Sequence, residues 1–153
     1  MGTTGEMARP AQVDRTLAAA PQSVAYARAL IDTVEPALPP DVRQRARLLM
    51  SEVVTNAVRH GAGTAVRVQI RRERGRLVVE VRDDGEGFEP DPSRPDPTQG
   101  SGWGVHLVAT LAQEWGVDAD GGTRVWFALD VADEELHAVA LQHHRPGGLS
   151  AAV

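Results

Sequence analysis

Apolar residues recur at helical spacing in three stretches of the chain. The first follows Pro21, which suits the first turn of a helix because its missing N–H costs nothing there. Its apolar positions are Val24, Ala27, Ile31 and Val34. A second helix is predicted from Asp41, whose carboxylate can cap it, to about His60, a length of roughly 30 Å at 1.5 Å per residue. Gly61 and Gly63 then end it as C-terminal glycines do.

The third helical stretch follows a proline-rich segment. Residues 89–102, "EPDPSRPDPTQGSG", contain four prolines and can form neither a helix nor a central strand. A loop of that length inside a compact domain is usually functional or disordered. Residues 103–116, "WGVHLVATLAQEWG", then predict a helix whose inward positions are Val105, Val108, Leu111 and Ala112.

Five other stretches have the composition of strands. A short first strand is predicted at Val13–Ala19. "TAVRVQIRRE" and "RLVVEVRDD" predict a hairpin around Gly75, and "GVDAD" and "TRVWFALDV" predict a closing hairpin across Gly121-Gly122. The order is strand, two helices, two strands, loop, helix and two strands. This order predicts an α/β two-layer sandwich, a mixed β-sheet with helices on one face.

Composition limits the class of protein. The 153 residues fit one domain, which we place at residues 13–131, with a flexible N-terminus (1–12) and a partly disordered C-terminal extension (132–153). Sixteen basic against 21 acidic residues give a net charge of −5, which argues against nucleic-acid or anionic-membrane binding. Every basic residue is Arg, and Cys is absent. Without an apolar start or a run of ~20 apolar residues, a cytoplasmic location is expected.

The second helix carries polar residues beside its buried face. On a helical wheel centred on Leu49, the apolar stripe consists of Val42, Ala46, Leu49, Val53 and Ala57. Glu52, Asn56 and His60 fall at about −60°, −20° and +20° on the same wheel. Burying an unpaired amide costs roughly 1–3 kcal/mol, so these groups suit a wet groove that holds a ligand. Alternatively, they cap neighbouring backbone or face solvent, and His60 is an ordinary residue for the last turn of a helix.

Two glycine-rich stretches add candidate binding chemistry. "VEVRDDGEGF" predicts a strand that ends at Asp83 and is followed by Gly85 and Gly87. Glycines there permit turns and the close approach of a ligand. Alone, this spacing is typical of plain turns, and a calcium loop fits it poorly. "GSGWGVHLV" places Gly102 and Gly104 at a helix start, where exposed N–H groups attract phosphate. It matches neither a dinucleotide fingerprint nor a Walker loop, which needs Lys.

The order and combination of these motifs are far more specific than each motif alone. "SEVVTNAVRHG", "VEVRDDGEGF", "GVHLVATLAQEWGV" and "TRVWFAL" together resemble the Bergerat-fold, histidine-kinase-like ATPase superfamily. Within it, the chain looks most like the small stand-alone bacterial anti-sigma-factor serine kinases. The resemblance covers about Val13 to Val131 and implies a histidine-kinase-like ATPase fold that binds ATP and Mg²⁺.

The resemblance also implies roles at the nucleoside end of an ATP site. Asp83 would accept a hydrogen bond from the adenine amino group, and Gly85 and Gly87 would let the backbone close on the ring. Thr123 would supply a hydroxyl at the far wall. The proline-rich segment (89–102) would be the lid.

At the phosphate end, the resemblance implies a second set of roles. Glu52 would be the general base, Asn56 would offer its side-chain oxygen to Mg²⁺, and Gly102 and Gly104 would present N–H groups to the phosphates. Such a kinase would phosphorylate an anti-anti-sigma antagonist, would sequester a sigma factor when the antagonist is absent, and could be a homodimer. Trp103 stands where many of these kinases carry Arg.

Two other functions remain compatible with the sequence. Trp103 and the acidic lid favour a non-catalytic, nucleotide-sensing module that binds protein partners. A detached histidine-kinase catalytic domain is the third possibility, but the chain lacks room for a dimerisation helix pair.

Overall fold

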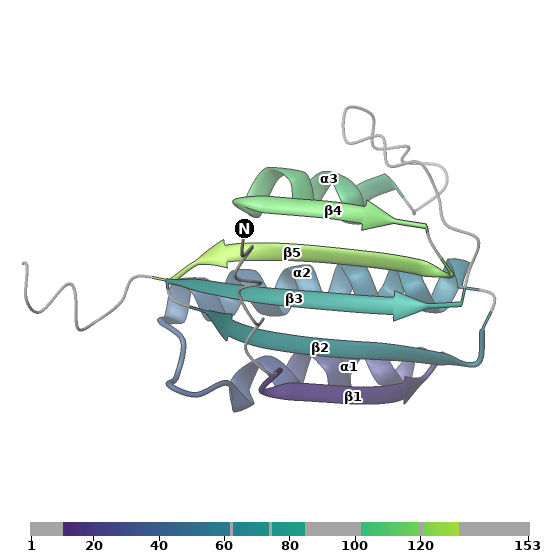
Figure 1. Ribbon diagram of the computed structural model, residues 1–153, viewed down its shortest axis with the longest axis horizontal. Coiled ribbons are helices and arrows are strands. Elements are labelled where there is room, and N and C mark those ends of the chain that lie inside the picture. The colour runs from purple at the N-terminus through teal and green to yellow at the C-terminus, as the bar shows by residue number, and fades with distance from the viewer. Residues whose placement is uncertain (1–10, 62, 74, 85–101, 120, 132–153) are drawn as a thin grey trace, which may run out of the picture.

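The computed structural model describes residues 11–61, 63–73, 75–84, 102–119 and 121–131. The elements within them follow the predicted order (Figure 1). They are β1 (Val13–Ala18), α1 (Gln22–Leu30), the 3₁₀ turn η1 (Ile31–Thr33), α2 (Pro40–His60), β2 (Ala65–Glu73), β3 (Arg76–Asp83), α3 (Gly102–Leu111), β4 (Glu114–Asp118) and β5 (Thr123–Asp130). Residues 89–101 of the predicted lid lie outside the described residues, as do residues 1–10 and 132–153.

The five strands form one sheet in the order β1-β2-β3-β5-β4. We expected a mixed sheet, but each of the four neighbouring pairs is antiparallel. The reason lies in the connection through α3. The chain leaves β3, passes along α3 and returns in β4, which runs in the same direction as β3. However, β5 lies between these two strands and pairs antiparallel with both.

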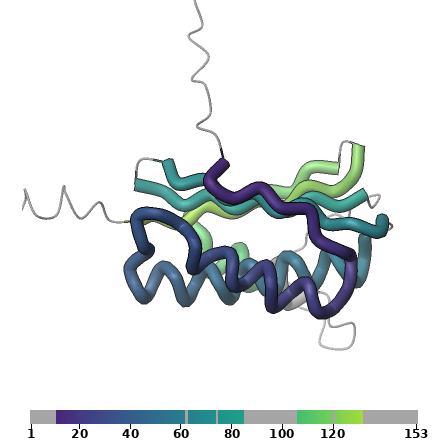
Figure 2. Tube along the Cα trace, turned by 90° about the horizontal axis from the view of Figure 1, so that it is seen from below, coloured from purple at the N-terminus to yellow at the C-terminus, as the bar shows by residue number. Residues whose placement is uncertain are grey.

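Helices α1, α2 and α3 cover one face of the sheet, and no element of the described residues covers the other, which we call the open face (Figures 1 and 2). The core lies between these two layers. Alternate residues of β2, β3 and β5 point into it: Val66, Val68, Ile70, Leu77, Val79, Val81, Phe127 and Leu129 are all buried. The predicted α2 stripe is confirmed, because its five apolar residues are buried against this layer. The two-layer sandwich is therefore as predicted, because periods of two and 3.6 residues each placed one apolar face toward the other layer.

Three local predictions need correction. Asp41 does not cap α2: Pro39 is the cap residue without a side-chain bond, and Pro40 begins the helix, where its missing N–H is harmless. The third helix ends at Leu111 rather than residue 116, because Glu114 and the following residues pair with β5. Gly61 ends α2 with extended backbone (φ −68°, ψ 137°) rather than in the left-handed conformation expected of a C-terminal glycine. No helix in the described ranges is long and apolar enough to cross a membrane.

Candidate nucleotide site

Helix α2 places Glu52 and Asn56 one turn apart along the edge of its buried stripe. Residues four apart lie on the same side of a helix, and both side chains are half-buried. They therefore border the core while remaining open to solvent. His60 is exposed in the last turn, which agrees with its interpretation as an ordinary C-terminal residue.

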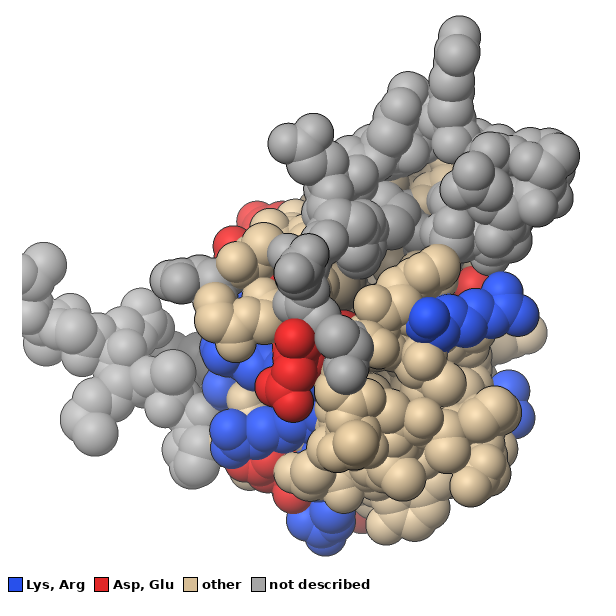
Figure 3. Space-filling model, turned by 90° about the vertical axis from the view of Figure 1, so that its right-hand side faces the viewer, with Lys and Arg blue, Asp and Glu red and all other residues tan. Residues whose placement is uncertain are grey.

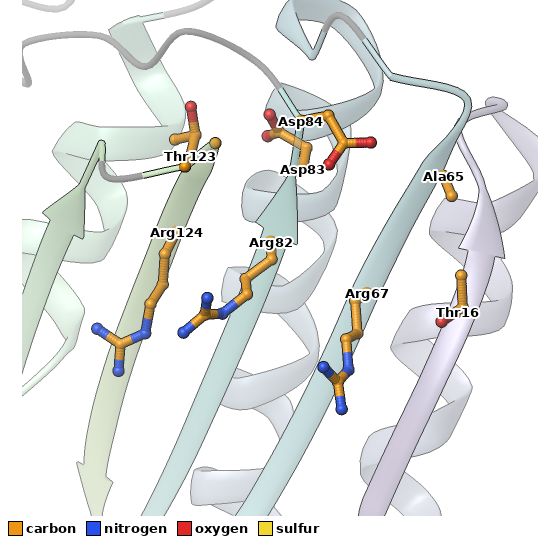
Figure 4. A pocket seen from close by; sticks show the side chains of 10 residues that line it. Thr16, Ala65, Arg67, Arg82, Asp83, Asp84, Thr123 and Arg124 are labelled. Atoms are coloured by element: carbon orange, nitrogen blue, oxygen red, sulfur yellow. The ribbon is translucent and has the colours of Figure 1, made fainter.

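The sheet register brings Asp83 and Thr123 together. Asp83 ends β3 and Thr123 begins β5, and the two residues are direct cross-strand partners. Both follow the alternation of the inward residues, so they lie on the helix-covered side of the sheet. Thr123 is buried and Asp83 is half-buried, whereas the neighbouring Asp84 is exposed. Figure 4 shows Asp83 and Thr123 close to the ends of their adjacent strands.

Three glycines lie against Asp83 and Asp84, and the sequence alone does not predict these contacts. A Cβ atom on Gly61 would lie 3.2 Å from both Cβ and Cγ of Asp83, and one on Gly63 would lie 2.7 Å from Oδ2 of Asp84. A Cβ on Gly122 would lie 2.4 Å from the backbone oxygen of Asp83. The end of β3 is therefore packed against the end of α2 on one side and the β4–β5 turn on the other. In the sequence, Gly61 and Gly63 are recognisable only as helix-ending residues, and their spacing gives no sign of these contacts.

The remaining predicted residues belong to α3 or lie outside the described ranges. Gly102 begins α3 and Gly104 lies in its first turn, where helix N–H groups have no partner within the helix. The assignment of these N–H groups to phosphate stays a prediction. Gly85 and Gly87 lie outside the described residues, so their assignment stays a prediction.

A hollow of about 330 Å³ lies at the same end of the sheet. Its lining comes from β1, β2, β3, β5 and the β4–β5 turn (Figure 4): Thr16, Ala65, Arg67, Arg82, Asp83, Asp84, Gly121, Gly122, Thr123 and Arg124. The arginines stand on the open face of the sheet, away from the helices. Asp83 and Thr123 of the predicted nucleotide site line this hollow, whereas Glu52 and Asn56 do not. Viewed from this end, blue basic and red acidic side chains lie close together among uncharged ones (Figure 3).

Arginines on the open face surround a buried carboxylate. Glu80, in the middle of β3, is only 3% exposed. Its Oε1 lies 2.7 Å from Arg82 Nε and 3.0 Å from Arg124 Nε, and its Oε2 lies 3.7 Å from Arg71 Nη1. Burial alone would raise the pKa of Glu80. Its contacts with Arg124 and Arg82 lower the pKa by more than burial raises it, so the pKa lies below its ordinary value. These ion pairs join β2, β3 and β5 across the open face of the sheet.

The donor groups fit magnesium better than a metal held entirely by the protein. No cluster of three or more His, Asp or Glu residues occurs within the described part of the chain. Mg²⁺ usually keeps several waters and binds through one or two protein oxygens plus substrate phosphates. The half-buried amide of Asn56 offers one such oxygen beside a carboxylate, so the residues present fit Mg²⁺ accompanied by a nucleotide.

Comparisons with known proteins bear on the fold of the chain. A family model described as a histidine kinase-like ATPase domain matches residues 17–129. The histidine kinase domain of the blue-light activated histidine kinase from Erythrobacter litoralis EL346 is similar in structure, with a TM-score of 0.51 and 24% identity, over 78% of this chain and 64% of that one. A second structure of this blue-light activated kinase gives a TM-score of 0.52 and 25% identity, over 75% of this chain and 42% of that one.

These matches confirm the predicted histidine-kinase-like ATPase fold. The chain spans less than two thirds of the length of either solved structure. No curated protein matches the sequence. The resemblance to anti-sigma-factor kinases in particular therefore stays a prediction.

Proposed function

Because the chain belongs to the histidine-kinase-like ATPase domain family, an ATP-binding family, we propose that it is a serine kinase of the anti-sigma-factor type. It transfers the γ-phosphoryl group of Mg·ATP to a serine of an anti-anti-sigma antagonist, and it sequesters a sigma factor when that antagonist is absent. The observation that carries the proposal is the placement of Glu52 and Asn56, a carboxylate and a metal-binding amide one turn apart and both half-buried.

Phosphoryl transfer requires few protein groups, because it depends mainly on positioning and on stabilising charge. The serine oxygen attacks the γ-phosphorus, its proton passes to the Glu52 carboxylate, and the bond from the γ-phosphorus to the bridging oxygen of ADP breaks. Asn56 would hold Mg²⁺ through its side-chain oxygen. When bound, Mg²⁺ neutralises negative charge on the phosphate oxygens. The first N–H groups of α3 donate to the same phosphates.

At the other end of the site, Asp83 reads the base. Its carboxylate accepts a hydrogen bond from the adenine amino group, and Thr123 lies beside it in the sheet register. Asp83→Asn is expected to weaken ATP binding about ten- to a hundred-fold, the scale of a hydrogen bond to a charged group. Asp84→Asn is the matched control. Because Asp84 is the exposed neighbour of Asp83, this substitution is expected to leave the affinity for ATP unchanged.

The test combines binding with transfer. Calorimetry measures Mg·ATP affinity, and γ-labelled ATP reports transfer to purified anti-anti-sigma proteins of the same organism. We expect Glu52→Gln to bind ATP normally but to transfer phosphate about 10²- to 10⁴-fold more slowly, the usual contribution of a general base. Asn56→Ala is expected to lose the Mg²⁺ dependence of ATP binding.

The outcomes separate the candidate functions. Acid-stable label on the antagonist supports a serine kinase, whereas acid-labile label on histidine would indicate a histidine-kinase activity instead. ATP binding without transfer to any antagonist would refute the kinase proposal in favour of a nucleotide-sensing, partner-binding module. Undiminished transfer by Glu52→Gln would refute its role as general base.

A further inference from the structure

We propose that Gly61 is a positioning residue for adenine selectivity. The inference rests on the proposed function, in which Asp83 reads the adenine amino group. Gly61 directly follows α2, and the side chain of Asp83 lies against it. A Cβ atom at position 61 would approach Cβ and Cγ of Asp83 to 3.2 Å, closer than the roughly 3.5–4.0 Å at which carbon atoms pack favourably.

Space, rather than backbone conformation, explains the glycine. The dihedral angles of Gly61 (φ −68°, ψ 137°) are accessible to any residue. Its N–H donates to the carbonyl oxygen of Ala57 at 2.9 Å, and a Cβ would lie only 2.4 Å from that same oxygen. An alanine therefore has the end of α2 on one side and Asp83 on the other. It must relieve the 2.4 Å contact with the Ala57 oxygen, which disturbs the last hydrogen bond of the helix, and it also crowds Asp83 at 3.2 Å. Both adjustments change the distance between Asp83 and α2.

That distance matters because α2 also carries the phosphate-end residues. Asn56 lies five positions before Gly61, about 7.5 Å along the helix at 1.5 Å per residue. Contact at Gly61 therefore sets the position of the base-reading carboxylate relative to Asn56 and Glu52. Binding constellations lose selectivity when their groups move by more than about 0.5 Å from the productive geometry. Gly61 thus fixes the spacing between the two ends of the nucleotide.

Gly63 provides a matched control in the same connection. A Cβ there would also be crowded, at 2.7 Å from Oδ2 and 2.9 Å from Cβ, but the crowded residue is Asp84 rather than Asp83. Gly63, like Gly61, has no positive φ. Gly63→Ala therefore crowds the carboxylate of Asp84 without contacting Asp83, the residue that reads the base.

The experiment compares two nucleotides by calorimetry in the presence of Mg²⁺. ATP carries the amino group, and purine riboside triphosphate has hydrogen in its place. Wild-type protein is expected to prefer ATP about ten- to a hundred-fold. Gly61→Ala is expected to lower this preference to that of Asp83→Asn, leaving affinity for the analogue within about three-fold, because phosphate contacts are retained. The double variant should lose no further preference, and Gly63→Ala should keep the wild-type value.

Each result has a distinct meaning. If wild type shows no preference, the role of Asp83 in the proposed function is wrong. If wild type prefers ATP and Gly61→Ala does so equally, the inference is overturned while the proposed function stands. Equal loss of both nucleotides would show a purely structural role, which also overturns it.

A second measurement applies if Gly61→Ala does not fold. The backbone amide resonance of Gly61 is followed by nuclear magnetic resonance in the wild-type protein. It is expected to respond differently to ATP and to the analogue, and to lose that difference in Asp83→Asn. Identical responses to both nucleotides would overturn the inference.

Discussion

Glu80→Gln tests whether the buried carboxylate on the open sheet face stabilises the fold. Glutamine keeps the size of the side chain and removes its charge, while three guanidiniums remain around it. Two of them, on Arg82 and Arg124, lie within 3.0 Å of Oε1. The substitution therefore leaves positive charges facing one another across neighbouring strands, an arrangement that destabilises a sheet.

The magnitude follows from the exposure of the partners. Breaking a fully buried ion pair costs about 3–5 kcal/mol, whereas an exposed pair contributes about 0–1 kcal/mol. Glu80 is buried, but the side chains of Arg82 and Arg124 are 52% and 29% exposed, so water partly stabilises them after the carboxylate is lost. We therefore expect Glu80→Gln to lower the free energy of unfolding by about 2 kcal/mol at pH 7.

The loss should depend on pH in a defined direction. The pKa of Glu80 is below its ordinary value in the folded protein, because the contacts with Arg124 and Arg82 outweigh the opposing effect of burial. A lowered pKa contributes stability that is complete above the unfolded pKa, about 4.3 for Glu, and is lost as pH falls through the folded pKa. The difference between wild type and Glu80→Gln should therefore shrink below about pH 4.

Urea unfolding followed by circular dichroism measures this difference. Glu114→Gln is the matched control: Glu114 also faces an arginine on the open face, at 3.2 Å from Arg76, but its side chain is 58% exposed. We expect the control to lose less than about 1 kcal/mol. Equal losses in the two variants, or a Glu80→Gln effect that persists unchanged in acid, would refute the stabilising role of the buried charge.

Two further predictions concern the turn of the closing hairpin and the edge of the sheet. Gly122→Ala should lower the free energy of unfolding by more than about 2 kcal/mol, because Gly122 has φ +122° and a Cβ there would lie 2.4 Å from the backbone oxygen of Asp83. Gly121→Ala is the control: Gly121 has φ +67° but no atom within 4 Å of an added Cβ, so it should lose only about 1 kcal/mol. Equal losses of the two variants in urea unfolding would contradict this prediction. Hydrogen bonds from Arg67 lower the pKa of Asp14 to about 2, so its stabilising contribution should disappear as pH falls through that value. Nuclear magnetic resonance titration should show the pKa returning toward 3.8 in Arg67→Gln, and an unchanged pKa would contradict the assignment.

The fold was largely predictable because its layers follow two simple periods. The α2 stripe and the alternation along β2 and β3 each mark one apolar face, and both faces meet in the core. Errors arose where a tertiary contact overrides a local pattern. Glu114 and Trp115 continue the helical spacing of α3, yet they pair with β5 because its backbone groups need a partner. The expected mixed sheet failed for a related reason, since the sequence does not show that β5 lies between β3 and β4.

The site was predictable only where its chemistry depends on residue type and local spacing. Glu52 and Asn56 could be placed on one helix face from their four-residue separation, and Asp83 and Thr123 could be placed at strand ends. The contact of Gly61 with Asp83 joins residues that are 22 positions apart, and it depends on how α2 docks against the sheet. The burial of Glu80 likewise depends on arginines from three different strands. A charged residue in the middle of an alternating strand predicts a solvated face, so nothing local distinguishes Glu80 from an exposed glutamate. Only the register, which aligns Arg82 with Arg124 beside it, creates the positive surroundings that make its burial tolerable.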